Sequence, residues 1–536
     1  MERRPGEDDK DREPARGDSE EPQPASSEAT ADPIRHHVRG SALLLSGRGL
    51  SLLLNFTTQV VVVGYLSKLE YGALSFVLAL AQSGGTLNLF GFQKTIPRFL
   101  PMYEERHEYG KMYGAMALAM TSLFGIGLVV VLVVHLCSGF IGGVLRTDPL
   151  TVSLLVALIV LLPVEAYDSL LVQFLAVFAG ARAIFLRRHI LGPGLRLAAV
   201  GAVILAHGSV FTLAAGYLAA SVVGIVLYTG LLLQVLHRKS LLRHLDRHTI
   251  EVPAREIVGF SLPLLTSDLL FVARSSLVVV ILEYFHPTTA VAEYRAIIPV
   301  ARLNTLVQVA FLPLFVPLAA RLFSRGDRSG VQRMHRQTSV WVLVLSFPIV
   351  AACVGLARPV TVTLFGERYE NSAAVLAVLA AGTFLYATLA FNVETMKVLG
   401  KPGFIAIGDI LATGAAVGSS LLLIPRFGAF GAGMAVTATF VVHGIANQIL
   451  LWRASGIHLL DLRFCKALAL VVLGVAVVAA VEWTLSPPLP VGLAVVAALT
   501  LALVARCRSL LKLEGTFPEL QAVPVLGRLF RSSSIG

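Results

Sequence analysis

Six basic side chains stand inside or at the edge of strongly apolar stretches of the sequence. They are Arg48, Lys94, Arg98, Arg274, Arg295 and Arg302. A charge at bilayer depth is costly unless it is paired, reaches the interface or lines a polar cavity. Guanidinium groups bind phosphate oxygens through paired hydrogen bonds, most strongly where water is excluded. We therefore predict a cationic cavity that binds a diphosphate and is formed by Arg48, Lys94, Arg98, Arg274 and Arg302.

Each of these basic residues also has a structural interpretation. Lys94 and Arg98 are four residues apart on one helix face, so both side chains could extend to the membrane interface. Arg48 and Arg274 could belong to structural ion pairs, and Arg295 could lie near the outer surface. The sequence leaves both interpretations open.

Three acidic residues in apolar stretches are candidates for binding a coupling proton or cation. Glu165 and Asp168 are three residues apart and share one helix face, and Asp268 lies six residues before Arg274. A structural polar cluster explains Glu165 and Asp168 equally well. The four cysteines have no metal-ligand spacing, so we predict no metal site and no cofactor, with H⁺ or Na⁺ as the candidate coupling ion.

Membrane-spanning helices must position these residues. The chain is 56% hydrophobic and 14% charged, with a mean hydropathy of +0.76. Crossing a bilayer takes about 20 apolar residues, and runs of that length recur. We predict an all-α polytopic membrane protein with about fourteen transmembrane helices. The predicted spans are 41–66, 73–96, 112–136, 150–177, 183–206, 211–236, 257–282, 290–320, 338–365, 372–396, 403–424, 429–452, 464–484 and 489–506.

The distribution of positive charge predicts the orientation in the membrane. With a cytoplasmic N-terminus, about 26 Lys and Arg residues, Arg187 among them, fall on the cytoplasmic side and about four fall opposite. We therefore expect a multi-pass protein of the cell (cytoplasmic) membrane with both termini in the cytoplasm. The net charge of +11 is explained by the membrane and does not indicate nucleic-acid binding.

Weak internal similarity predicts two lobes related by a parallel pseudo-two-fold repeat. Tyr71 corresponds to Tyr294, and Gly216 to Gly431, at similar offsets that preserve orientation. The predicted lobes are 41–236 and 257–452, joined by a cytoplasmic linker at 237–256. Residues 464–506 add two C-terminal helices, and 1–40 and 507–536 are cytoplasmic tails, the first of them polar, acidic and expected to be disordered.

Several motifs give the chain a family resemblance. They are YLSKLEYGALS at 65–75, GFQKTIPRFLP at 91–101, FSLPLL at 260–265, VLGKP at 398–402 and LIPRFGAFGA at 423–432. Together they resemble the oligosaccharide and polysaccharide flippase family (O-antigen flippase-like) of the multidrug/oligosaccharidyl-lipid/polysaccharide exporter superfamily. That family often has an Asp-Arg pair in the seventh helix where this chain has Arg274-Ser-Ser276, so no role resting on that aspartate is carried over.

The resemblance implies a transporter and not an enzyme. Its expected activity is to flip a polyprenyl-diphosphate-linked oligosaccharide from the cytoplasmic to the outer leaflet by alternating access, for cell-surface polysaccharide biosynthesis. Expected partners are this lipid, the membrane lipids and the glycan polymerase or glycosyltransferase machinery.

Two other functions remain open. An ion-coupled multidrug antiporter of the same superfamily would need an acidic cavity for cationic drugs, which the charge signs disfavour. A membrane polysaccharide polymerase or ligase would need a long outer loop, and the predicted outer loops are short. The sequence also has no P-loop, so direct ATP hydrolysis is not expected.

Overall fold

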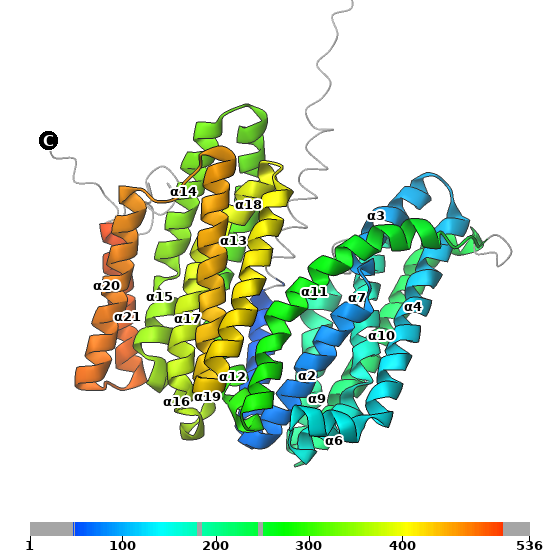
Figure 1. Ribbon diagram of the computed structural model, residues 1–536, viewed down its shortest axis with the longest axis horizontal. Helices are drawn as coiled ribbons and strands as arrows, with labels where there is room; N and C mark the ends of the chain where they lie inside the picture. Colours follow the sequence, from blue (N-terminus) through cyan, green and yellow to red (C-terminus); the bar gives the residue numbers. More distant parts are fainter. Residues whose placement is uncertain (1–46, 48, 180–184, 245–249, 508–536) are drawn as a thin grey trace, which may run out of the picture.

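The computed structural model describes residues 47, 49–179, 185–244 and 250–507, and every regular element in these residues is a helix. The first helix spans Gly49–Tyr65 and has no label in Figure 1. It is followed by α2 (Lys68–Asn88), α3 (Phe92–Glu105), α4 (Tyr109–Leu136), α5 (Ser138–Leu145), α6 (Pro149–Leu158), α7 (Leu161–Phe178), the π-helix η1 (Leu186–Leu191), α9 (Gly192–Leu205), α10 (Val210–Arg238) and the 3₁₀-helix η2 (Leu241–His244).

The second half of the chain is equally helical. It comprises α11 (Ala254–Phe285), α12 (Thr288–Ala301), α13 (Asn304–Ser324), α14 (Arg328–Leu345), α15 (Phe347–Val350), the π-helix η3 (Ala351–Gly355), α16 (Ala357–Phe365), the 3₁₀-helix η4 (Glu367–Tyr369), α17 (Ser372–Leu389), α18 (Phe391–Val398), α19 (Pro402–Ser455), α20 (Leu462–Leu485) and α21 (Leu489–Arg506).

Eleven helical stretches in the described residues are long and apolar enough to cross a membrane, and three shorter apolar helices accompany them. One of the eleven, α19, contains two of the predicted spans. Gly428 has non-helical backbone angles there, and the Ser419 hydroxyl donates to the Ala435 carbonyl at 3.2 Å, so the two halves of α19 lie side by side. The polytopic all-α fold is confirmed, and the count of fourteen spans stays a prediction.

The helices form two bundles (Figure 1). We name the first helix to α10 the N-terminal lobe and α12–α19 the C-terminal lobe; α20 and α21 lie at the outer side of the latter, against α14 and the α15–η3 segment. The lobes diverge toward the end that carries the α3–α4, α10–α11 and α13–α14 connections, which we name the linker end. They approach each other at the opposite end, the junction end.

Polar contacts join the lobes at the junction end. Lys68, at the start of α2, forms an ion pair with Glu293 of α12, with 2.8 Å between Nζ and Oε1. Arg368 in η4 donates hydrogen bonds to the carbonyls of Val63 and Gly64 at the end of the first helix. These contacts hold the two lobes together at the junction end.

Helices α2 and α12 also approach closely at the junction end. A Cβ atom on Gly72 would lie 2.2 Å from the carbonyl oxygen of Thr288, the first residue of α12. No side chain fits in that space, so glycine at this position permits the contact between the lobes.

Helix α11 contacts both lobes. Near its start, Ser261 lies 2.8 Å from the Thr95 hydroxyl of α3, and just after its end His286 donates from Nε2 to the Ile424 carbonyl of α19 at 2.8 Å. The predicted second lobe begins at residue 257, whereas the first part of α11 packs on the N-terminal lobe. The predicted domain limits remain untested.

Candidate functional site

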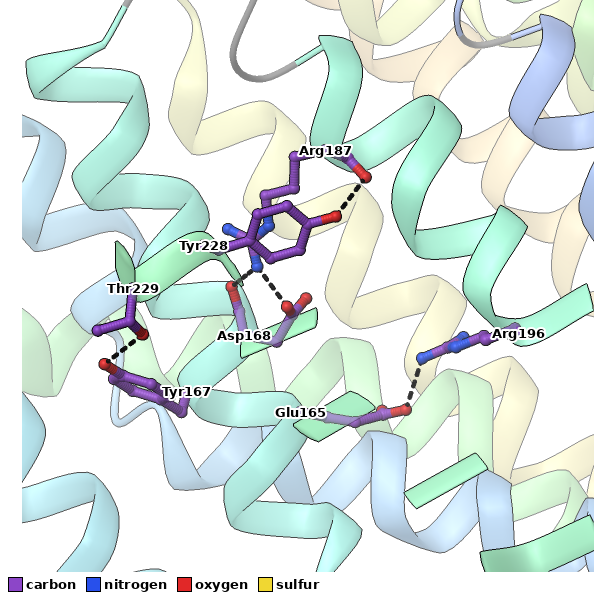
Figure 2. Close-up of polar contacts among 7 residues, drawn as sticks. All are labelled: Glu165, Tyr167, Asp168, Arg187, Arg196, Tyr228 and Thr229. Carbon is purple, nitrogen blue, oxygen red and sulfur yellow. Dashed lines mark hydrogen bonds and ion pairs between the residues drawn. The ribbon is translucent and has the colours of Figure 1, made fainter. Parts of the chain in front are cut away.

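Two ion pairs connect α7 with the η1–α9 segment (Figure 2). Arg196 of α9 donates from Nη2 to Glu165 Oε1 at 3.1 Å, and Arg187 of η1 pairs with Asp168. The two acids are three residues apart on α7, so they project from one face. Each charge is compensated by its partner, which lowers the cost of placing it inside an apolar bundle.

Arg187 is the most tightly enclosed of these four side chains, with only 3% of the side chain exposed. Its Nη2 atom also donates to the Asp168 carbonyl at 2.8 Å, and the guanidinium lies 4.1 Å from the centre of the Tyr228 ring. Its Nη1 atom is buried and has no hydrogen-bond partner among the described residues. One donor of this arginine is therefore unused.

The π-helical turn η1 places Arg187 at this position. The Gly192 N–H donates to the Arg187 carbonyl, the wider hydrogen-bond pattern of a π-helix, and the next residue, Pro193, has no N–H to continue an α-helical ladder. The Tyr228 hydroxyl donates to the same carbonyl at 3.2 Å. Proline and tyrosine together thus stabilise a local geometry that turns Arg187 toward α7.

A polar cavity of about 440 Å³ lies beside these ion pairs, and we name it the N-lobe cavity. It is lined by amide, hydroxyl and charged side chains contributed by the first helix and by α2, α3, α7, η1, α9 and α10. The polar lining residues are Asn55, Gln82, Gln93, Glu165, Asp168, Ser169, Gln173, Arg187, Arg196, Ser221 and Tyr228. The break between α2 and α3 at Gly91, which has a φ of 76°, brings Gln93 into this lining.

A second cavity of about 680 Å³ lies between the two lobes, and we name it the interlobe cavity. One wall comes from the first helix and from α2, α7, α9 and α10, and the other from α12, α13 and the residues between them. The two cavities adjoin, because they share Asn55, Gln82, Glu165, Arg196 and Ser221. Several apolar side chains, among them Leu52, Leu53 and Phe56, line the interlobe cavity as well.

Two arginines of the interlobe cavity have no acidic partner in the part of the chain that the structure describes. Arg295 and Arg302 are seven residues apart, about two turns, and so lie on the same side of α12 and its C-cap. No ion pair among the described residues involves either of them, whereas Arg196, which also lines this cavity, is paired with Glu165. The free positive charge of this cavity therefore comes from the C-terminal lobe.

The predicted site residues are distributed over several places. Arg302 lines the interlobe cavity, and Arg48 lies outside the described residues. Lys94 Nζ lies 2.6 Å from Asp268 Oδ1, between α3 and α11, and Arg98 lies 4.3 Å from the centre of the Phe260 ring.

The remaining candidates are also paired. Arg274 donates from Nη1 to Asp409 Oδ1 at 2.9 Å, and His443 Nε2 lies 3.3 Å from the same carboxylate oxygen. Lys94, Arg98 and Arg274 do not belong to the lining of either cavity. The grouping of all five basic residues in one cavity, and the ion-coupling roles of Glu165, Asp168 and Asp268, stay predictions.

Sequence reasoning left three arginines out of the site. Arg295 has a two-turn spacing from Arg302 that could have placed both on one face. For Arg196 the sequence indicates only a charge within a predicted membrane span, and this does not identify its partner. Arg187 falls within the predicted span 183–206 and is counted with the cytoplasmic charges, and nothing in the sequence indicates the π-helical turn that directs it to Asp168.

Comparison with known proteins agrees with this architecture. No curated protein sequence matches the chain significantly. Among solved structures, the lipid II flippase MurJ in an inward closed conformation matches with a TM-score of 0.69 at 10% identity, over 87% of this chain and 99% of that one. A multidrug resistance MATE family transporter of the MOP superfamily, in an inward-facing conformation, matches with a TM-score of 0.60 at 12% identity, over 76% and 95%.

A third structure and a family profile complete the comparison. A mutant of the Vibrio cholerae MATE transporter VcmN matches with a TM-score of 0.53 at 15% identity, over 80% of this chain and 98% of that one. The profile of the family described as "Polysaccharide biosynthesis protein" matches residues 37–323, more than half of the 536-residue chain. The predicted family resemblance is confirmed, and the chain belongs to the family described as "Polysaccharide biosynthesis protein", with eleven helical stretches in the described residues that are long and apolar enough to cross a membrane.

Proposed function

We propose that this protein is a transporter, not an enzyme, and that it flips a polyprenyl-diphosphate-linked oligosaccharide from the cytoplasmic to the outer leaflet by alternating access. The observation that carries the proposal is that Arg295 and Arg302, in the cavity between the lobes, have no acidic partner among the described residues. Two guanidinium groups on one side of a cavity suit the two phosphates of such a lipid, since each can bind phosphate oxygens bidentately.

The surroundings of the arginines fit the rest of the substrate. Leu52, Leu53 and Phe56 give the interlobe cavity an apolar wall on the first helix, and the N-lobe cavity offers polar side chains next to it. A glycolipid has the same three parts, namely an apolar chain, a charged link and a polar head. The role of the family in polysaccharide biosynthesis and the fold shared with a lipid II flippase also support a lipid-linked saccharide as substrate.

The proposed direction rests on the charges of the connections. Basic residues gather at the linker end, among them Arg321, Arg325 and Arg333 around the α13–α14 connection (Figure 1). Positive connections favour the cytoplasmic side, so the lobes would diverge toward the cytoplasm in this conformation. The substrate would then enter the interlobe cavity from the cytoplasmic leaflet and leave when the junction end opens. The location in the cell membrane, cytoplasmic termini, H⁺ or Na⁺ coupling and glycan-assembly partners belong to the same proposal.

A flipping assay tests the proposal. Purified protein is reconstituted in liposomes with a fluorescent polyprenyl-diphosphate oligosaccharide, and an impermeant reagent reports how much lipid reaches each leaflet. We expect the wild type to equilibrate the lipid and the Arg295→Ala/Arg302→Ala variant to be at least tenfold slower. Arg321→Ala is the matched control, because Arg321 is an exposed arginine outside both cavities.

The same liposomes separate the alternative functions. A wild-type protein that flips no such lipid but extrudes cationic dyes against an ion gradient would replace the proposal with a multidrug antiporter. Equal flipping by the wild type and the double arginine variant would leave transport intact but refute the role of the arginine pair.

A further inference from the structure

The N-lobe cavity is polar but carries no net charge. Its charged lining consists of two acids, Glu165 and Asp168, and two arginines, Arg187 and Arg196, and they pair with each other. The interlobe cavity beside it has the unpaired Arg295 and Arg302. Adjoining cavities of such different charge are suited to different parts of one ligand.

The lining of the N-lobe cavity combines hydrogen-bond donors and acceptors at close quarters. Each amide side chain, such as those of Gln82, Gln93 and Gln173, offers both a carbonyl and an NH₂ group. Sugar hydroxyl and acetamido groups likewise donate and accept, so amides can satisfy both capacities. A lining made of paired charges and amides binds such groups without attracting a free ion.

Two groups in this lining point to a ligand. Arg187 is almost fully buried and its Nη1 atom has no partner among the described residues, although a buried guanidinium N–H normally donates to an acceptor. Asp168, its partner, keeps 45% of its side chain exposed. The lining therefore includes a buried donor without a partner among the described residues and a carboxylate available to accept hydrogen bonds from a ligand.

We propose that the N-lobe cavity is the subsite for the sugars nearest the diphosphate, and that it selects uncharged sugars. This inference rests on the proposed function, because it takes the diphosphate to lie at Arg295 and Arg302. The two cavities share Arg196 and Glu165, so a group attached to the diphosphate enters the N-lobe cavity directly. Its volume of about 440 Å³ falls within the roughly 300–1,000 Å³ of small-molecule sites.

The pairing of the charges gives the selectivity. A uronic acid would bring its carboxylate close to Glu165 and Asp168, and those two acids already balance the positive charges of Arg187 and Arg196. Like charges at short range repel each other, and the repulsion is stronger in a protein cavity than in bulk water. An uncharged N-acetylhexosamine meets no such repulsion.

Binding of three defined lipids tests this subsite. The probes are polyprenyl diphosphate alone, the same lipid carrying N-acetylglucosamine, and the same lipid carrying glucuronic acid, each titrated into the full chain in nanodiscs. The variants are Gln173→Ala and Ser169→Ala, two lining residues on α7. Gln234→Ala is the matched control, since Gln234 is exposed on α10 and lines neither cavity.

We expect the wild type to bind the N-acetylglucosamine lipid more tightly than the other two. Each lining variant should weaken binding of that lipid roughly three- to tenfold, the loss of about one hydrogen bond, and leave the Kd for polyprenyl diphosphate unchanged. Gln234→Ala should match the wild type with all three lipids. Two lining variants at separate positions guard against misfolding of either one.

Three results would overturn the subsite. These are equal wild-type affinity for all three lipids, no effect of either lining variant, or equal weakening of all three lipids by both variants. In the first two cases binding of polyprenyl diphosphate still supports the arginine pair. If the wild type binds none of the lipids, the proposed function itself fails.

Discussion

The ion pair between Lys68 and Glu293 should control the opening of the junction end. Lys68 begins α2 and Glu293 belongs to α12, so the bond must break when the lobes separate there. Lys68 Nζ also lies 5.3 Å from the centre of the Tyr369 ring, which adds an attraction to the C-terminal lobe. Lys68→Ala removes both interactions at once.

The size of the effect follows from partial burial of the pair. Both side chains are 22% exposed, between the fully exposed pairs that contribute at most about 1 kcal/mol and the buried ones whose disruption costs about 3–5 kcal/mol. We take the contribution of this ion pair to closure as about 1–2 kcal/mol. Its loss would change the ratio of closed to open junction ends roughly 5- to 30-fold. Lys68→Glu should favour opening further, since two carboxylates would then face each other.

Distances between spin labels measure this opening. Labels at Gly143→Cys on α5 and Glu367→Cys in η4 lie in different lobes at the junction end, and both positions are exposed. The exposed native cysteines, Cys137 and Cys465, are first replaced by serine. We expect a longer-distance population in Lys68→Ala that is rare in the wild type.

A charge swap provides the control. Lys68→Glu/Glu293→Lys should restore much of the short-distance population, because the ion pair can form in the reverse sense. If Lys68→Ala and Lys68→Glu both leave the distance distribution unchanged, the pair does not contribute to closure and the reasoning is refuted.

Three further predictions concern stability. Gly72→Ala places a Cβ against the α12 backbone, so the melting temperature should fall by several degrees and the junction-end labels should move apart; an unchanged protein would contradict the close contact. Hydrogen bonds from the Ser329 hydroxyl and the Gly330 backbone N–H hold the pKa of Asp327 below its ordinary value. The stabilisation by this carboxylate is therefore present above about pH 4 and is lost as the pH falls through the lowered pKa. Asp327→Ala should therefore lower the melting temperature at pH 7 and less so at pH 3, and an equal loss at both would argue against the carboxylate. Lys94→Met leaves Asp268 buried without its ion-pair partner and should lower the free energy of unfolding by about 3–5 kcal/mol. Asp268→Asn should lower it less, because Lys94 is 40% exposed and can reach water; chemical denaturation compares the two variants.

The fold could be predicted from the lengths of the apolar runs. Hydrocarbon thickness fixes the length of a spanning helix, so the predicted ranges overlap helices of the described residues. Some ranges, such as 73–96 and 290–320, cross a break between two helices. The break at Gly428 falls between two predicted spans for the same reason. The lengths of the apolar runs do not predict the packing of α11 on both lobes, because that packing depends on contacts between residues far apart in the sequence.

The candidate site was predicted only in part, because apolar context identifies costly charges but not their partners. Lys94 finds Asp268 on a helix 174 residues away, and Arg274 finds Asp409 at a separation of 135. In the sequence alone, the members of these two pairs cannot be distinguished from unpaired charges that line a cavity. Arg302 lines the cavity, and it has no acidic partner among the described residues.

The central claim is that the diphosphate of the substrate binds to Arg295 and Arg302 between the lobes. A cryo-EM structure of the full chain in nanodiscs with saturating polyprenyl-diphosphate oligosaccharide tests it most directly. The account predicts density for the two phosphates within hydrogen-bond distance of both guanidinium groups, with the sugars extending toward the N-lobe cavity. Diphosphate density elsewhere, or an interlobe cavity without lipid at saturation, would contradict it.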